Sequence, residues 1–276
     1  CYPEPQYELT TVKIPCGVKT IGNYCFKDCY NLQSVTIPET VTTMGEGVFK
    51  MSSSYGMALK SVVLPSNLTS IPKDTFYYCS TLENVNIPKN VMSIGDYAFN
   101  NCTKLKNVTF PKGLESIGAS AFSNCSEISD LVLPKSLKSI GASAFSRCIK
   151  NNIKSIPTSV TTIGDQAFAF NLSIRTIDIP SSITTLGRQI FNRCDGIIVK
   201  TTLTENAEGW DSRWNTGATT IYNSANNNLS SGNRYFFQND CKYLIKTDTT
   251  DEHKYLSLEF CFKTDEKVVL DTKVTF

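Results

Sequence analysis

The sequence contains almost no histidine and no long apolar run. Its single histidine, His253, lies in the polar stretch TDEHKY. One imidazole excludes the common zinc sites, which use several, and leaves little for acid–base catalysis. No uninterrupted run of about 18 apolar residues occurs, so no transmembrane helix is predicted. The motifs of serine hydrolases, zinc proteases, phosphate-binding loops and CxxC redox proteins are also missing. We therefore predict that the protein is not an enzyme and has no catalytic residues, no metal site and no cofactor.

The sequence also lacks a strong charge of either sign. Its 27 basic and 25 acidic residues leave a formal charge of +2. Proteins that bind nucleic acid or anionic membranes usually carry a clear basic excess. No signal-peptide pattern follows the first residue, Cys1. We therefore expect no nucleic-acid partner, and membrane association only through an anchor outside this sequence.

Prolines recur at a nearly constant spacing through the first two thirds of the chain. The interval is 23 residues in six cases and 27 in one. An apolar residue precedes each proline, further apolar residues follow three and six positions after it, and phenylalanine follows at eleven. The prolines are Pro15, Pro38, Pro65, Pro88, Pro111, Pro134, Pro157 and Pro180, and the phenylalanines are Phe26, Phe49, Phe76, Phe99, Phe122, Phe145, Phe168 and Phe191. So short a repeat cannot close a core alone, so the repeats are expected to stack and share one.

Each repeat can be divided into three segments. The stretch LENVNIP, which ends at Pro88, alternates as a short strand that pairs in parallel with the next repeat until the proline ends it. NVMSIG is a second extended segment, and Gly95 fits a positive φ or a tight corner. DYAFNN predicts a helical or 3₁₀ turn that carries Phe99 into the core. The expected fold is therefore an α/β repeat solenoid of about eight 23-residue repeats with short parallel strands.

The segments VTIPETVTTMGEGVF, VNIPKNVMSIGDYAFNNCTKL and VTFPKGLESIGASAFSNC resemble the BspA-like, or Treponema pallidum type, leucine-rich repeats. The resemblance covers residues 9–199. It implies a right-handed coil, display on the surface of bacteria or of some parasitic protists, and adhesion to host or microbial proteins. It implies no shared catalytic residue.

Two places depart from the repeat. The stretch KMSSSYGMALK adds four residues and predicts a loop on the convex side. In CIKNNIKSIP, Asn151 and Lys154 stand where leucine and valine are expected. We predict that Ile149 and Ile153 compensate through a bulge or a local shift of register.

The pattern ends near residue 200, which suggests a division of the chain. The expected parts are a solenoid over 1–199, a cap over 200–222, a polar linker over 223–233 and an antiparallel β unit of four strands over 234–276. Trp210 and Trp214 either cover the open end of the last repeat or stack on carbohydrate. The cap is the favoured interpretation, because a solenoid has to cover its apolar end.

Outward positions two and four residues before the prolines are predicted to form the concave face. Small polar side chains dominate there, and we call the following set the strand face: Ser34, Thr36, Asn84, Asn86, Asn107, Thr109, Asp130 and Asp178. It is either an ordinary solvated sheet or a broad surface that binds a protein weakly, since it lacks the aromatic and arginine anchors of tight interfaces.

Cysteine recurs fourteen residues after most of the prolines, as Cys29, Cys79, Cys102, Cys125, Cys148 and Cys194. We predict a column of buried, structural thiols, because side chains that point in parallel are poorly placed for disulfides. Cys241 and Cys261 fall on neighbouring predicted strands and form the most plausible disulfide.

The sequence therefore predicts a non-catalytic, extracellular or cell-surface protein. Its concave face would bind protein partners, such as host extracellular-matrix or microbial surface proteins. The alternative is a structural spacer that projects other domains of a longer surface protein.

Overall fold

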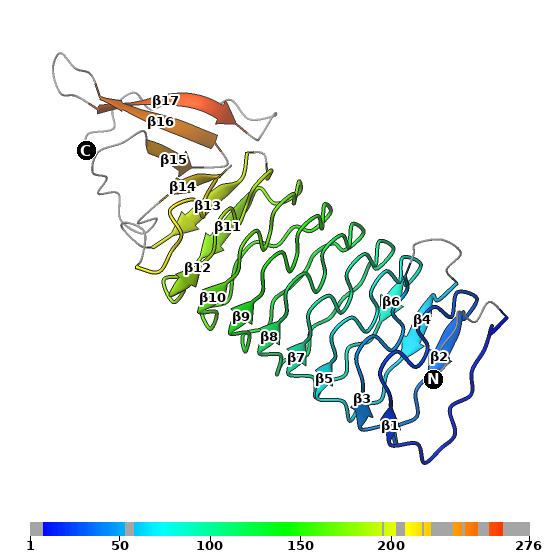
Figure 1. Ribbon diagram of the computed structural model, residues 1–276. Helices are drawn as coiled ribbons and strands as arrows, with labels where there is room; N and C mark the ends of the chain where they lie inside the picture. Colours follow the sequence, from blue (N-terminus) through cyan, green and yellow to red (C-terminus); the bar gives the residue numbers. More distant parts are fainter. Residues whose placement is uncertain are drawn as a thin grey trace.

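The protein forms a stack of parallel coils, followed by a small antiparallel sheet (Figure 1). The computed structural model describes residues 8–52, 58–194, 196–202, 208–216, 218–221, 234–238, 241–247 and 254–261. The predicted linker, the last predicted strand, His253 and the inserted residues at 53–57 lie outside this part of the chain.

One series of strands lies just before the prolines, and two further strands of this series follow the last proline, Pro180. These pre-proline strands are β2 (Ser34–Thr36), β4 (Ser61–Val63), β6 (Asn84–Val85), β11 (Thr176–Ile179), β13 (Ile198–Thr201) and β14 (Thr219–Ile221). They form two separate parallel sheets, β2-β4-β6 and β11-β13-β14. The strand β13 crosses the boundary predicted at residue 199, so the coil extends into the segment assigned to the cap.

Strands of a second kind follow the prolines. These post-proline strands are β1 (Thr20–Ile21), β3 (Thr43–Met44), β5 (Ser70–Ile71), β7 (Ser93–Ile94), β8 (Ser116–Ile117), β9 (Ser139–Ile140), β10 (Thr162–Ile163) and β12 (Thr185–Leu186). Six of them form the sheet β12-β10-β9-β8-β7-β5, which has more strands than any other sheet among the described residues (Figure 1). Each residue pairs with the one a repeat further on, as in Ser93 with Ser116, so equivalent side chains form straight rows.

The segment that carries the phenylalanine contains no helix, which corrects the α/β expectation: the described residues include strands and turns only. Alternate amides in this segment donate to the next coil. Those of Tyr97, Phe99 and Asn101 reach carbonyls of Ala119, Ala121 and Ser123 over 2.8 Å each. The amides between them bond within the segment, as that of Asn100 does to the carbonyl of Tyr97 over 3.1 Å. The segment therefore alternates single turns with pairing between coils, and no continuous helix forms.

Left-handed residues explain why no helix forms there. Tyr97 has a φ of 57° and Asn101 a φ of 60°, and equivalent residues in the other coils behave alike. Each such residue costs roughly 1–2 kcal/mol and interrupts helical hydrogen bonding. The bonds between coils offset that cost.

One continuous core runs through the coils. Its centre is a column of stacked phenylalanines, in which Phe99 and Phe122 have ring centroids 5.0 Å apart and planes inclined by 8°. The stack runs without interruption from Phe26 to Phe191. Beside it lies a row of aliphatic side chains, including Leu82, Leu105 and Ile128, that are fully buried.

Gly95 occupies the tight corner that the sequence allowed, and its φ is not positive. A Cβ atom on Gly95 would lie 2.5 Å from the backbone nitrogen of Lys73 in the preceding coil. Adjacent coils approach too closely here for a residue with a Cβ atom, and the same is true at Gly118 and Gly141.

The irregular coil keeps its register, which corrects part of the expected compensation. Asn151 occupies the leucine position itself, fully buried, and its backbone amide donates to the carbonyl of Cys148 as in regular coils. Ile149 is 40% exposed and fills no core position. Lys154 occupies the position that holds a buried valine in other coils, but it is exposed, and the neighbouring Ile153 is buried instead. Only the alternation of inward and outward side chains in this strand shifts, by one residue.

The pre-proline sheet is interrupted at this irregularity (Figure 1). Pairing reaches Asn107 from one side and Ser155 from the other. Between them Asp130 has a φ of 47°, which is incompatible with a regular strand. The continuous concave row predicted from the sequence is therefore divided.

The tryptophans close the coil. Trp210 pairs with Leu186 as another repeat would, and its Nε1 donates to the carbonyl of Ile183 over 2.9 Å. Trp214 is fully buried and meets Trp210 edge to face, with centroids 5.1 Å apart. Such rings have no free face for stacking on a sugar, which favours the cap.

The final described strands are β15 (Arg234–Gln238), β16 (Cys241–Thr247) and β17 (Lys254–Cys261). They form the antiparallel sheet β15-β16-β17, in which Cys241 lies opposite Cys261.

Candidate functional site

The strand face is exposed at every predicted position. The side chains of all eight residues, from Ser34 to Asp178, face outward from the pre-proline strands or from the residues that continue them. They do not form one row, because Asp130 lies at the interruption. Two apolar residues, Val63 (56% exposed) and Val132 (77% exposed), lie among them.

The six predicted column cysteines are buried, and none of them forms a disulfide with another described cysteine. Five thiols donate to the carbonyl of a phenylalanine in the preceding coil; Cys102, for example, reaches Phe76 over 3.2 Å. Burial raises the pKa of Cys29 to about 11 and of Cys148 to about 12. Burial also raises the pKa of Cys79, Cys102 and Cys125 well above the ordinary value. These thiols are therefore poor nucleophiles and poor metal ligands.

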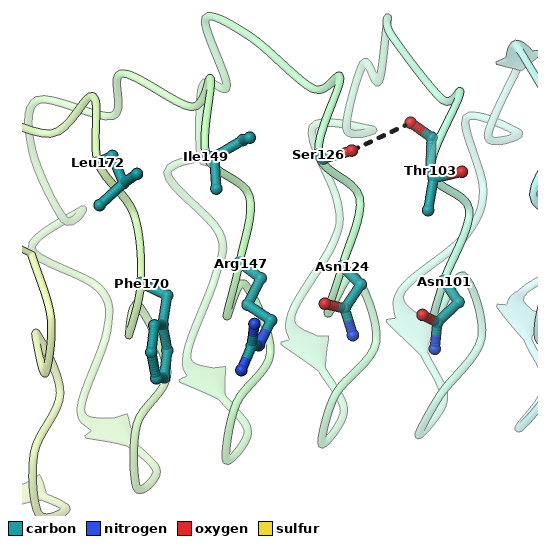
Figure 2. A pocket seen from close by; sticks show the side chains of 8 residues that line it. All are labelled: Asn101, Thr103, Asn124, Ser126, Arg147, Ile149, Phe170 and Leu172. Carbon is teal, nitrogen blue, oxygen red and sulfur yellow. Dashed lines mark hydrogen bonds between the residues drawn. The ribbon is translucent and has the colours of Figure 1, made fainter.

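A groove that the sequence did not predict crosses the turns of four consecutive coils (Figure 2). Its volume is about 360 Å³. Each coil contributes the two residues found thirteen and fifteen positions after its proline. The lining residues, which we call the turn groove, are Asn101, Thr103, Asn124, Ser126, Arg147, Ile149, Phe170 and Leu172.

The half of the turn groove nearer the N-terminus is polar. The Ser126 hydroxyl donates to the Thr103 carbonyl over 3.4 Å, which fixes that wall. The carboxamides of Asn101 and Asn124 lie side by side on adjacent coils (Figure 2). Both residues have a positive φ, of 60° and 61°. That conformation suits asparagine better than most residues and turns both side chains the same way.

The other half is apolar and cationic. The guanidinium of Arg147 lies over the ring of Phe170, 4.4 Å from its centroid. Ile149 is 40% and Leu172 51% exposed, on adjacent coils. The lining contains no carboxylate, and Glu127 close by is held by Lys150 over 2.7 Å. Aromatic and arginine side chains are enriched among the residues that hold protein interfaces together, and the strand face has neither.

A weak sequence signal for the groove exists. The position fifteen after the proline is polar in several coils but is Ile149 and Leu172 in two successive ones. Both lie outside the core pattern, so an exposed apolar pair on neighbouring coils could have been inferred.

A sequence profile for the BspA type leucine-rich repeat region matches residues 5–91 and 69–198, with six copies. The chain belongs to the BspA-type leucine-rich repeat family. This confirms the resemblance found in the sequence. The repeats of this family are scaffolds, and the fold is the expected stack of coils. No curated protein matches the chain significantly.

Two solved structures are similar to this BspA-type chain. One is a leucine-rich repeat protein from Bacteroides ovatus, 25% identical, with a TM-score of 0.59 over 77% of this chain and 63% of that one. This chain therefore spans less than two thirds of that relative. Another is a leucine-rich repeat protein from T. pallidum, 22% identical, with a TM-score of 0.47 over 68% of this chain and 78% of that one.

Within the described ranges, His, Cys, Asp and Glu side chains form no group able to hold a metal ion. Those same residues contain no helix long and apolar enough to span a membrane.

Proposed function

We propose that this chain is the repeat scaffold of a non-catalytic cell-surface protein that binds protein partners. The observation that carries the proposal is the turn groove, where Arg147, Phe170, Ile149 and Leu172 gather on a surface built from four coils. Host extracellular-matrix proteins and surface proteins of other microbes are the partners we expect. The family membership supports both surface display and the absence of catalysis.

The position of the binding site distinguishes two forms of this proposal. The strand face offers small polar groups on an interrupted sheet, which favours broad, weak contact. The turn groove offers a cation, an aromatic ring and two exposed aliphatic side chains within a short distance. Because such residues carry most of the energy at protein interfaces, the turn groove is the stronger site.

Two matched variants test the proposal. One carries Arg147→Ala and Leu172→Ser in the turn groove; the other carries Ala at Asn84, Asn86, Asn107 and Thr109 on the strand face. Binding of the intact protein to matrix proteins and to partner cells is measured by surface plasmon resonance and by cell adhesion. Thermal melting followed by circular dichroism confirms that both variants stay folded.

We expect the groove variant to bind at least ten times more weakly and the strand-face variant to bind nearly normally. The reverse result would move the site to the strand face. Absence of saturable binding by the unmodified protein would reject the proposal and favour the spacer, for which stacked coils of constant spacing form a suitable rod.

A further inference from the structure

The two halves of the turn groove differ in what they could bind, and together they specify a ligand. We propose that the groove holds an extended peptide segment of a partner protein that carries a carboxylate and an aliphatic side chain two residues apart. This inference rests on the proposed function and names the chemistry of its partner.

Arg147 supplies the charge recognition. Its guanidinium face is occupied by the ring of Phe170, 4.4 Å from the centroid. Stacking uses the face of the guanidinium and leaves its edge N–H groups free. Arg147 forms no ion pair among the described residues, and the lining has no carboxylate. A pre-oriented, unpaired guanidinium is the usual partner of a carboxylate, which it binds through two parallel hydrogen bonds.

Ile149 and Leu172 supply the apolar contact. They are 40% and 51% exposed and occupy the same position in adjacent coils. Figure 2 shows the two side chains on one side of the groove, beside Arg147 and Phe170. Covering this surface with an aliphatic side chain is favourable at roughly 25 cal/mol for each Å² buried. A strongly hydrated ligand such as a phosphate ion would leave these side chains uncovered.

Asn101 and Asn124 indicate that the ligand is a peptide. The side chain of Asn124 forms no hydrogen bond to any other residue in the described part of the chain, and its carboxamide lines the groove. A carboxamide offers both a donor and an acceptor, which matches the two groups of a peptide backbone. The Nδ2 of Asn101 already donates to the Oδ1 of Asn100, which leaves the Oδ1 of Asn101 as an acceptor beside the complete carboxamide of Asn124. These groups on adjacent coils would bond to backbone groups of a chain running along the solenoid axis.

The dimensions of the groove fix the spacing of the ligand. Four coils span roughly 14 Å at about 4.8 Å per coil, which equals four or five residues of extended chain. Alternate residues of an extended chain point to the same side. Leu172 lies one coil away from Arg147 and two positions further along its turn, so the step between them is diagonal and longer than one coil spacing. A carboxylate over Arg147 and an aliphatic side chain over Leu172 therefore fit residues i and i+2, which are roughly 6.6 Å apart in an extended chain.

Short peptides of defined composition test the proposal with the intact chain. The probes are acetylated, amidated hexapeptides of serine that carry Glu and Leu two residues apart, in both orders. The controls replace Glu by Gln or Leu by Ser. Binding is measured by titration under NMR at low salt, since a short segment with one ion pair binds with a dissociation constant on the order of 1 mM.

We expect Glu→Gln in the peptide to weaken binding at least fivefold, and Leu→Ser to weaken it similarly. Arg147→Gln should abolish the preference for Glu over Gln, and Arg147→Glu should create a preference for a peptide with Lys in its place. Salt should reduce the Glu preference and leave the Leu preference unchanged. The strand-face variant, with Ala at Asn84, Asn86, Asn107 and Thr109, should bind every probe as the unmodified chain does.

Equal binding of Glu and Gln peptides, or no binding of any peptide, would overturn the inference. Self-association that Arg147→Gln abolishes, measured by analytical ultracentrifugation, would also overturn it, because a second copy would then occupy the groove. If protein partners still bind the Arg147→Gln variant normally, this inference fails and the proposed function stands. If the unmodified chain binds no protein partner at all, the proposed function itself fails.

Discussion

The side-chain amide of Asn171 donates to the carbonyl oxygen of Phe145 over 2.8 Å, in the place where five other coils use a cysteine thiol. The same amide nitrogen also reaches the carbonyls of Phe168 and Ala169. The phenylalanine carbonyl of each preceding coil thus accepts a hydrogen bond from either a thiol or an amide. The column of small side chains is therefore a set of hydrogen bonds between coils as well as packing.

Removing the side-chain donor of Asn171 should destabilise the protein, and replacing it by the thiol that other coils use should not. We expect Asn171→Ala to lower the free energy of unfolding by about 1–3 kcal/mol, since buried carbonyls would lose a partner. Asn171→Cys should stay within about 1 kcal/mol of the original, because it restores the bond and removes the unpaired Oδ1 of Asn171. Urea unfolding measures both. A Cys variant as unstable as the Ala variant would contradict this interpretation.

Asn151 should be replaceable with a gain in stability. Its side chain is fully buried, and neither its Nδ2 nor its Oδ1 has a hydrogen-bond partner. Equivalent positions hold leucine or isoleucine, so Asn151→Leu should raise the free energy of unfolding by about 1–3 kcal/mol. Denaturant unfolding and hydrogen exchange over residues 128–156 measure the change. Loss of stability instead would indicate that ordered water satisfies the amide.

The buried thiols should make the fold sensitive to alkali. Their folded-state pKa is raised above the ordinary 9.0, to about 11 for Cys29 and about 12 for Cys148. The unfolded chain therefore loses thiol protons before the folded one does. Their contribution to stability is complete below pH 9 and is lost as the pH rises from there through the folded values. The free energy of unfolding then falls by up to about 1.4 kcal/mol per pH unit for each thiol. Chemical unfolding at pH values from about 8 to about 11, which begin below the ordinary thiol pKa and rise through it, measures the loss. A flat profile would contradict it.

Glycine at the corner should tolerate no side chain. A Cβ on Gly141 would lie 2.5 Å from the backbone nitrogen of Ala119, whereas one on Gly113 would meet nothing within 4 Å. We expect Gly141→Ala to destabilise by more than about 2 kcal/mol, because two coils would have to separate. Gly113→Ala is the control and should be neutral or stabilising by about 0.4–1 kcal/mol. Equal effects of the two substitutions would exclude coil contact as the reason.

The predicted disulfide gains a geometric basis but stays a prediction. Cys241 and Cys261 are directly opposite on β16 and β17. Of the 11 cysteines, nine should then react with an alkylating reagent after unfolding without reductant, and all 11 after reduction. Mass spectrometry counts the added groups. Reaction of all 11 without reductant would show that the two thiols remain free.

The regular part of the coil could be predicted because identical residues recur at identical spacing. Phe99 and its equivalents, Leu82 and its equivalents, and the buried thiols all lie where the pattern places them. Gly95 was placed at a corner, but the close approach of Lys73 belongs to a neighbouring coil and has no trace in the local sequence.

The irregular features could not be predicted, because they depend on a comparison of energies. The sequence suggested that a buried amide would be avoided by a bulge, but the coil keeps its regular turn at Asn151 and leaves that side chain without a hydrogen-bond partner. Likewise, the helix expected around Phe99 gave way to left-handed residues such as Tyr97, whose cost is offset by bonds visible only in three dimensions. The turn groove leaves only a partial trace: the period of 23 residues brings Ile149 and Leu172 onto neighbouring coils, but the contact between Arg147 and Phe170 depends on side-chain conformation.

The pairing of Trp210 with Leu186 affects whether two solenoids can associate end to end. A stack of coils ends in a row of amides and carbonyls that matches its own other end, so bare ends would join into fibres. Trp210 takes up the backbone of the last coil, and its ring, with that of Trp214, covers the apolar surface beneath. The tryptophans therefore occupy the edge of the post-proline sheet at which another rod would otherwise pair.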